Sequence, residues 1–356
     1  MLHIIAIDWL SLFCTSPTGV LNTEPNGAWG YKKMPYGTRQ YKELYEVYFM
    51  DEKLCEVQQL PCSSVLRARS LIVKWDNRQL YVREFWDRLD RFLIAQNLTV
   101  QNISRIDVCA DFNRFKCSEC VPFIQDFMSH KTRHIGRGVG AAHFNHGGKN
   151  VGGFSHAYLN YTGLSFGSHS SDTRVYLYNK TFELLTQGDK PWIRDQWAEV
   201  GLTNTAEKPV WRLEVSLKSK AMKFKDKKTR TVQTIDVQRV RDHGELADIY
   251  YMYVNSLFQF IMNRNGITNV TREPRLPLFD GAPKYVRAFV RNVSPGNRAE
   301  RILIKKLWQM ADMYRGKDMV EDEGVTKLLA TELSECTDLK EWLKVKKNTW
   351  DKPSKK

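Results

Sequence analysis

Three short segments carry the residue types best suited to chemistry. They are 105–112 (RIDVCADF), 174–180 (RVYLYNK) and 211–218 (WRLEVSLK), and in each of them apolar and polar side chains alternate. Because successive side chains of a strand point to opposite faces, each segment predicts a strand with one apolar and one polar face. The polar positions are Arg105, Asp107, Asp111, Arg174, Tyr176, Tyr178, Lys180, Arg212, Glu214, Ser216 and Lys218.

If the three strands are neighbours in one sheet, their polar faces bring carboxylates, tyrosines and cations into one patch. Carboxylate oxygens are the ligands that Mg²⁺ and Mn²⁺ prefer. A tyrosine beside cations is a candidate nucleophile, because its phenol, with a pKa of about 10, needs nearby positive charge to ionise at neutral pH. The alternative interpretation is a solvated face of an antiparallel sheet, which shows the same alternation without any chemical role.

The surrounding elements predict an α+β fold class, with a central antiparallel sheet, helices and a helical C-terminal part. Strands are predicted at 41–49, at 69–75 and at the N-terminus, and the spacing of apolar residues predicts an amphipathic helix over 83–96. Further helices are predicted over 245–262 and within 298–345. Prolines at 274, 277 and 283 suggest a boundary region. We therefore expect a catalytic domain over 1–235 and a mostly helical, DNA-binding part over 245–356.

The composition indicates a globular protein with a polyanionic partner. The 356 residues include 54 Lys and Arg against 40 Asp and Glu, a formal charge of +14, which favours nucleic acid as the partner. Asp8 interrupts the apolar N-terminus too early for a signal peptide, and no segment approaches the ~18 apolar residues that span a bilayer. The seven cysteines are scattered, which favours reduced thiols and a cytoplasmic location, with no membrane association.

The same segments resemble a known family. The run 166–172 (FGSHSSD), followed by Arg174 and by 177–180 (LYNK), resembles the YxGSRxSDRxxRxYNK signature of the Rep_trans rolling-circle replication initiators of plasmids and phages. The segment 105–112 resembles the RxDxxxDF strand of that family, and 211–218 resembles its WRxExxLK strand. The order and spacing of the motifs also agree, and the resemblance covers residues 1 to 220.

The resemblance implies a tyrosine nucleophile and an HUH-like catalytic domain that lacks the histidine pair. Tyr178 would attack a phosphodiester at the origin, giving a 5′-phosphotyrosyl link and a 3′-OH primer, and the strand would later be rejoined. Lys180 and Arg174 would stabilise the developing charge. Tyr176 stands where the family has an arginine, and it lies on the same face as Tyr178. Tyr176 therefore stays a rival nucleophile.

The resemblance also implies a divalent cation, Mg²⁺ or Mn²⁺. Asp107 and Glu214 would hold it, with Asp111 as the third candidate. Arg105 and Arg212 would orient these carboxylates. The cation would polarise the scissile phosphate and neutralise charge in the transition state.

A basic segment follows the third strand and is a candidate contact for DNA phosphates. Residues 218–230 (KSKAMKFKDKKTR) hold seven basic residues and one acid, although a charge run of this kind is also typical of a solvated loop. The predicted DNA-binding residues are Lys218, Lys220, Lys223, Lys225, Lys227, Lys228 and Arg230. Origin recognition is expected from the C-terminal cations Arg287, Arg291, Arg298, Arg301, Lys305 and Lys306. The implied partners are origin DNA with a single-stranded or cruciform nick site, and a host helicase and polymerase; the oligomeric state stays open, a dimer included.

Other interpretations compete with this one. Cys117, Cys120, His130 and His134 imitate a zinc site, but the spacing favours a core helix between them. The glycines of 136–140 lack the context of a phosphate-binding loop. The whole chain is alternatively a non-catalytic nucleic-acid-binding protein, or a relaxase-like or transposase-like strand-transfer enzyme.

Overall fold

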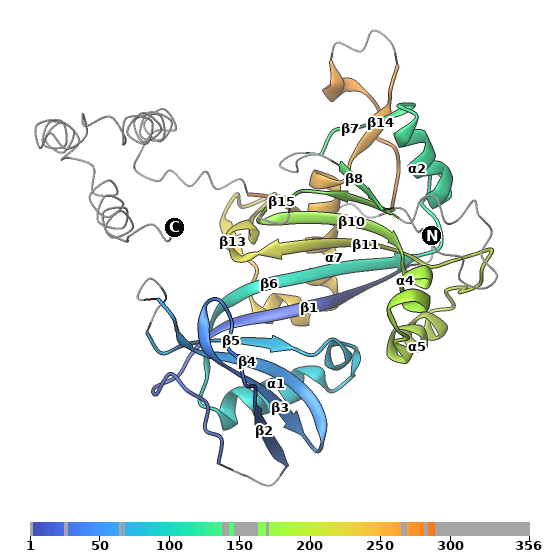
Figure 1. The fold of residues 1–356 in the computed structure, drawn as a ribbon. Coiled ribbons are helices and arrows are strands. Elements are labelled where there is room, and N and C mark those ends of the chain that lie inside the picture. Colours follow the sequence, from blue (N-terminus) through green and yellow to red (C-terminus); the bar gives the residue numbers. More distant parts are fainter. Residues whose placement is uncertain are drawn as a thin grey trace, which may run out of the picture. The chain divides into compact units, whose positions relative to one another are not determined.

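The computed structural model describes residues 3–24, 28–63, 66, 68–136, 142–145, 163–168, 171–264, 269–280 and 284–288 (Figure 1). The chain divides into two compact units, Met1–Phe289 and Val290–Lys356, and all described residues belong to the first. The helices predicted within 298–345 lie outside the described residues, as do the predicted DNA-reading cations of that region. No helix in the described part of the chain is long and apolar enough to cross a bilayer.

One large antiparallel sheet dominates the first unit (Figure 1). Its ten strands have the order β2-β3-β4-β5-β1-β6-β11-β10-β9-β8. Their bounds are β1 His3–Thr15, β2 Trp29–Lys33, β3 Tyr41–Phe49, β4 Glu52–Pro61, β5 Ser70–Trp75, β6 Thr99–Phe112, β8 Ala142–Asn145, β9 Gly163–Phe166, β10 Thr173–Asn179 and β11 Trp211–Lys218. The fold class predicted from the sequence, α+β with a central antiparallel sheet, is therefore confirmed.

Two smaller sheets and several helices complete the described fold. The sheet β13-β12-β15 and the pair β14-β7 are also antiparallel. Their bounds are β7 Thr132–His134, β12 Lys223–Asp226, β13 Val232–Thr234, β14 Phe260–Met262 and β15 Tyr285–Arg287. The helices are α1 Phe85–Ala95, α2 Cys120–Met128, α4 Lys180–Gln187, α5 Pro191–Glu199, α6 Val237–Arg241 and α7 His243–Leu257, with short 3₁₀ turns η1 Arg78–Tyr81, η2 Ser219–Ala221 and η3 Val270–Arg272.

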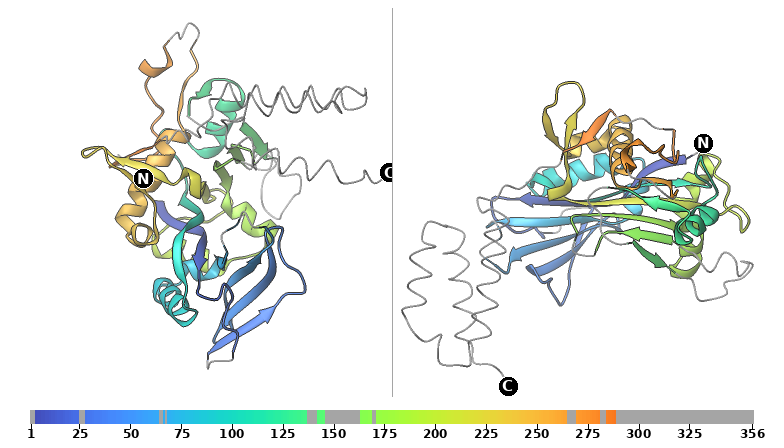
Figure 2. Two further views of the ribbon diagram at one scale, coloured as in Figure 1. Left: turned by 90° about the vertical axis from the view of Figure 1, so that its left-hand side faces the viewer. Right: turned by 90° about the horizontal axis from the view of Figure 1, so that it is seen from above.

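The apolar face of the large sheet carries the main core. Trp75 of β5 meets Phe85 of α1 edge-to-face, with ring centroids 5.4 Å apart. On the other half of the sheet the hydroxyl of Tyr250 in α7 donates to the carbonyl of Leu213 in β11 at 3.0 Å. Figure 2 shows α1 and α7 on the same side of the sheet. This packing explains why the alternate positions of the strands are apolar.

A second, smaller core covers part of the opposite face. It is made by buried residues of α4, α5 and the segment that follows them: Leu184, Ile193, Trp197, Leu202 and Val210. Tyr81 of η1 packs against this cluster. The polar sides of β6 and β11 are therefore enclosed, and the expectation of a solvated face is wrong for Asp107, Asp111, Arg212 and Glu214, which are all buried.

Most of the predicted elements form, with one correction. The strands predicted at 41–49 and 211–218 have those bounds, and the helix predicted over 83–96 is α1. The helix predicted over 245–262 ends at Leu257, and the residues Phe260–Met262 form strand β14 instead. A short apolar run fits a buried strand as well as a helix, and pairing with β7 decides between them here. Helix α7, assigned by sequence to the C-terminal part, packs on the large sheet.

Candidate active site on the polar face of the sheet

The three segments singled out by sequence are adjacent strands, in the order β6-β11-β10. Their register sets the polar side chains in cross-strand rows, because directly opposed residues of antiparallel strands share a face. One row is Asp107–Ser216–Arg174, the next is Cys109–Glu214–Tyr176, and the third is Asp111–Arg212–Tyr178. The predicted carboxylates and both tyrosines thus lie on one face.

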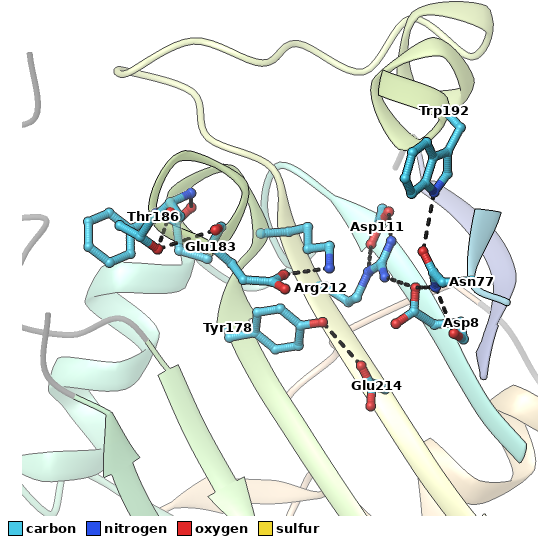
Figure 3. Close-up of polar contacts among 12 residues, drawn as sticks. Asp8, Asn77, Asp111, Tyr178, Glu183, Thr186, Trp192, Arg212 and Glu214 are labelled. Carbon is cyan, nitrogen blue, oxygen red and sulfur yellow. Dashed lines mark hydrogen bonds and ion pairs between the residues drawn. The ribbon is translucent and has the colours of Figure 1, made fainter. Parts of the chain in front are cut away.

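A β-bulge adds Asp8 to this face. Ile7 pairs with Val108 and Trp9 with Asp107, so Asp8 is the extra residue of β1. Its carboxylate accepts a hydrogen bond from the Asn77 amide at 3.2 Å (Figure 3). It also accepts one from the Tyr81 hydroxyl at 2.7 Å. Sequence reasoning assigned no role to Asp8, although a charged residue inside an apolar strand was the available signal.

Arg212 is fully buried and joins two carboxylates (Figure 3). Its Nε and Nη2 donate to the two oxygens of Asp111 at 2.6 and 2.7 Å, and its Nη1 donates to Asp8. Burial alone raises the pKa of Asp8, but the charges of Arg212 and Lys180 outweigh burial and hold that pKa well below its usual range. Asp8 therefore stays ionised beside Arg212.

Asp111 accepts hydrogen bonds from two buried side chains in this network. Its Oδ2 also accepts a hydrogen bond from the Trp197 indole at 2.7 Å, so both carboxylate oxygens have partners. Asp111 was predicted as the third candidate metal ligand. Its oxygens face Arg212 and Trp197, where it fixes the guanidinium in place, and it does not line the cavity that Asp107 and Glu214 share.

Asp107 is paired with Arg105. The Nε of Arg105 donates to one carboxylate oxygen at 3.0 Å and its Nη2 donates to the other. Burial raises the pKa of Asp107 and prevails over the opposing effect of Arg105. Arg105 therefore orients Asp107, in the position that the resemblance implied for it.

Glu214 has a phenol as its hydrogen-bond partner. The Tyr178 hydroxyl donates to Glu214 Oε2 at 3.1 Å (Figure 3). Burial, followed by the charges of Asp107 and Asp8, raises the pKa of Glu214 to about 8. Burial and the nearby Glu214 raise the pKa of Tyr178 well above 10. In this structure Tyr178 is therefore a neutral phenol beside a carboxyl group that binds a proton readily.

Each tyrosine of β10 has its own cation. Lys180, the first residue of α4, is buried with its Nζ 5.5 Å from the centroid of the Tyr178 ring, and it is ion-paired with Glu183. The guanidinium of Arg174 lies 4.5 Å from the centroid of the Tyr176 ring. The two predicted charge-stabilising cations are thus divided between the two candidate nucleophiles.

A glycine on the neighbouring strand makes room for the Tyr178 backbone. Gly163 of β9 is the register partner of Tyr178. A Cβ at position 163 would overlap the carbonyl oxygen of Leu177 and would meet the Cβ of Tyr178 at 3.0 Å. Gly163 therefore permits the close approach of β9 and β10 beside the candidate nucleophile.

A cavity of about 380 Å³ opens at the carboxylates. Its lining residues are Asp8, Trp9, Lys53, Glu56, Lys74, Trp75, Asp76, Asn77, Arg105, Asp107, Lys190 and Glu214. Three carboxylates of the site, Asp8, Asp107 and Glu214, therefore face one space. Four cations line the same cavity, together with the carboxylates of Glu56 and Asp76: Lys53, Lys74, Arg105 and Lys190.

A divalent cation fits only part of this donor set. The described residues contain no group of three or more His, Cys, Asp or Glu side chains arranged to hold a metal ion. Mg²⁺, however, is commonly held in phosphoryl-transfer sites by one or two carboxylates, with waters and substrate phosphate completing its shell. Asp107 and Glu214 line one cavity and meet that requirement.

The basic segment after β11 includes the first strand of a hairpin, and its residues Ala221, Met222 and Phe224 are buried in the main core. Strands β12 and β13 pair, and the turn between them is capped by Asp226, which accepts from the amides of Lys228 and Thr229 at 2.7 and 2.9 Å. Among the predicted DNA contacts, Lys220, Lys225, Lys227, Lys228 and Arg230 are exposed, whereas Lys218 and Lys223 are half-buried. Their role in DNA binding stays a prediction.

Other predicted residues have local structural contacts. Arg287 of β15 donates to the Thr173 hydroxyl at 3.2 Å and lies over the Tyr253 ring. Cys120 is buried in α2, and His134 contacts the Leu257 carbonyl and stacks on a phenylalanine. The histidines 143 and 146 and most of the 136–140 glycines lack described side chains.

Comparison with solved structures finds a distant likeness. No family model matches the sequence, and no curated protein matches it. A solved structure, the rolling circle replication initiator protein from Geobacillus stearothermophilus, is similar to 76% of this chain and 92% of its own, with 14% sequence identity and a TM-score of 0.42. At this sequence identity and TM-score, the function of that protein cannot be assigned to this chain.

Proposed function

We propose that this protein is a rolling-circle replication initiator that nicks and rejoins origin DNA through Tyr178, with Mg²⁺ or Mn²⁺. The observation that carries the proposal is the Tyr178–Glu214 hydrogen bond on a buried face that also holds Asp107. The resemblance of the same residues to the initiator motifs supports it, as does the formal charge of +14.

The chemistry begins with loss of the phenolic proton. Tyr178 is held as a neutral phenol, and the ionised form of Glu214 is the group placed to accept its proton. The phenolate oxygen then attacks phosphorus, the bond from phosphorus to the 3′ oxygen breaks, and that oxygen takes a proton to become the primer hydroxyl. Rejoining reverses these steps: the 3′ hydroxyl attacks the phosphotyrosyl phosphorus and Tyr178 is released.

The surrounding cations act on charge. Arg212 opposes the rise in the Tyr178 pKa, and Lys180 lies over its ring, so both stabilise a phenolate. Asp107 and Glu214 would hold the divalent cation, which supplies polarisation of the scissile phosphate when bound. Either role of Glu214, ligand or proton acceptor, requires the ionised carboxylate. Nicking should therefore increase as the pH rises toward about 8.

The test is formation of a covalent adduct. Supercoiled DNA that carries the gene and its flanking sequence is incubated with the full-length protein and Mg²⁺ or Mn²⁺, with EDTA as the control. We expect a nicked circle with protein on its 5′ end, and a DNA-linked peptide that contains residue 178. Tyr178→Phe should abolish the adduct, and Tyr176→Phe, two residues along the same face, should retain it.

The other outcomes assign the alternatives. Loss of the adduct in Tyr176→Phe but not in Tyr178→Phe would move the nucleophile to Tyr176. Salt-sensitive binding with no adduct under either metal would identify a non-catalytic nucleic-acid-binding protein. Nicking of a transfer origin without support of replication would identify a relaxase-like enzyme. Asp107→Asn and Glu214→Gln should lose cleavage far more than binding.

A further inference from the structure

A line of polar side chains crosses four strands beside the carboxylates. Lys74 of β5 pairs with Ser11 of β1, Ser11 pairs with Arg105 of β6, and Arg105 pairs with Lys218 of β11. Because directly opposed residues share a face, these four side chains form one row, here called the basic row. The basic row lies two residues, or about 7 Å, along the strands from the row of Asp107.

Trp9 holds two cations of the basic row in place. The Nζ of Lys74 and the guanidinium of Arg105 each lie 4.5 Å from the centroid of the Trp9 ring. Cation–π contact restricts both side chains before any ligand arrives.

The basic row borders the cavity of the candidate active site. Trp9, Lys74 and Arg105 line the same space as Asp107 and Glu214. At its other end the row reaches Lys218, which is half-buried and is the first residue of the basic segment 218–230. The row therefore runs from beside the carboxylates to the start of that segment.

We infer that the basic row with Trp9 binds the backbone of single-stranded DNA and leads it across the sheet from the scissile phosphate toward Lys218. Phosphates are anionic, which suits the cations of the basic row. Proteins that bind single strands commonly combine a basic groove along the backbone with aromatic side chains. The inference rests on the proposed function, since it places the strand that Tyr178 would cut.

The row favours a single strand over a duplex. The carboxylates and Ser11 are buried, so a phosphate must descend to the sheet surface to reach them. Duplex DNA is stiff over about 150 base pairs and cannot bend locally into a space of this size without a large deformation energy. A flexible single strand can follow the row.

Binding of labelled single-stranded oligonucleotide, measured by fluorescence anisotropy across a salt series, tests the inference without requiring cleavage. The full-length Tyr178→Phe protein is used in EDTA so that no strand is cut, with a duplex of the same sequence in parallel. Lys74→Gln should weaken single-strand binding roughly fivefold and reduce the slope of log affinity against log salt by about 0.7, the value for one phosphate contact. Trp9→Phe, which keeps an aromatic ring but weakens the cation–π contact that holds Lys74 and Arg105, should weaken binding roughly threefold.

The matched control is Lys33→Gln. Lys33 is also a strand lysine ion-paired with a glutamate of the next strand, as Lys74 is with Glu56, but it lies outside the cavity. We expect unchanged affinity and slope for this control. A Lys74→Gln protein that binds like the control would overturn the inference, and so would equal losses on single strand and duplex.

The two proposals fail in different ways. If Lys74→Gln weakens binding as expected but wild-type protein never forms an adduct, the proposed nicking function is wrong and the inference about the basic row holds. If wild-type protein forms the Tyr178 adduct while Lys74→Gln binds like its control, the inference about the basic row is wrong and the proposed nicking function holds. Thermal unfolding of Trp9→Phe shows whether this variant is still folded. If it is not, the result for Lys74→Gln alone decides whether the inference holds.

Discussion

Replacing Glu214 by glutamine should change how the stability of the protein depends on pH. Burial and the charges of Asp107 and Asp8 raise the pKa of Glu214 from 4.5 to about 8. Between these two values the folded carboxyl group keeps a proton that the unfolded chain has lost. The contribution to stability is therefore fully present below pH 4.5 and is lost as the pH rises to about 8.

The size of the effect follows from the same pKa. One pH unit inside this window changes the free energy of unfolding by about 1.4 kcal/mol for one group, so the whole window amounts to on the order of 5 kcal/mol. Glutamine has nearly the same shape, accepts the Tyr178 hydrogen bond and never ionises. Relative to the wild type, Glu214→Gln should therefore gain stability steadily as the pH rises.

Urea unfolding at pH values from 5 to about 9, without divalent cations, measures this difference. Subtracting the wild-type curve from the Glu214→Gln curve removes contributions that the two proteins share. Glu199→Gln, at an exposed position at the end of α5, is the control and should follow the wild type. If the Glu214→Gln and wild-type curves ran parallel across this range, Glu214 would not hold a proton in the folded protein, and the buried, negatively charged environment described for it would be refuted.

Three further substitutions test the frame of the site. Arg212→Met leaves the carboxylates of Asp8 and Asp111 without their partner, so urea unfolding should show a loss of about 3–5 kcal/mol in the free energy of unfolding. Arg194→Met, at an exposed ion pair, is the control and should lose less than ~1 kcal/mol. Asn179→Ala removes the N-cap of α4 and should cost about 1 kcal/mol by thermal unfolding, while Asn179→Asp retains the cap. Gly163→Ala should reduce adduct formation, because its added methyl displaces the Tyr178 backbone. Gly30→Ala is the control and should not reduce it, since its added methyl meets its nearest neighbour at 3.5 Å. Equal adduct formation by the two variants would show that Gly163 has no role in the site.

The strands of the site could be predicted because the apolar core enforces their pattern. Val108, Leu213 and Leu177 lie in successive strands and all pack into the main core, so a period of two is imposed on each segment. Once that face is fixed, the alternate positions must share the other face. This is why Asp107, Glu214 and Tyr178 could be expected together if the strands were neighbours.

Two features of the site could not be predicted by the same reasoning. The bulge at Asp8 shifts the register of β1, and a strict period of two places Asp8 on the face opposite Trp9. The burial of the polar face comes from α4, α5 and η1, which are distant in sequence from β6. An alternating pattern carries no information about what covers its polar side.

The distribution of partners among the buried carboxylates argues that this face is more than structural. Replacement of buried ion pairs by apolar residues is often neutral or stabilising, so stability alone does not favour charges here. Asp8 and Asp111 share the guanidinium of Arg212, whereas Glu214 has a phenol as its hydrogen-bond partner. One carboxyl group is thereby kept ionised and another is made to bind a proton near neutral pH, within a single buried network. Such a separation of pKa values is typical of sites that move protons, and the proton nearest to Glu214 is that of the Tyr178 hydroxyl.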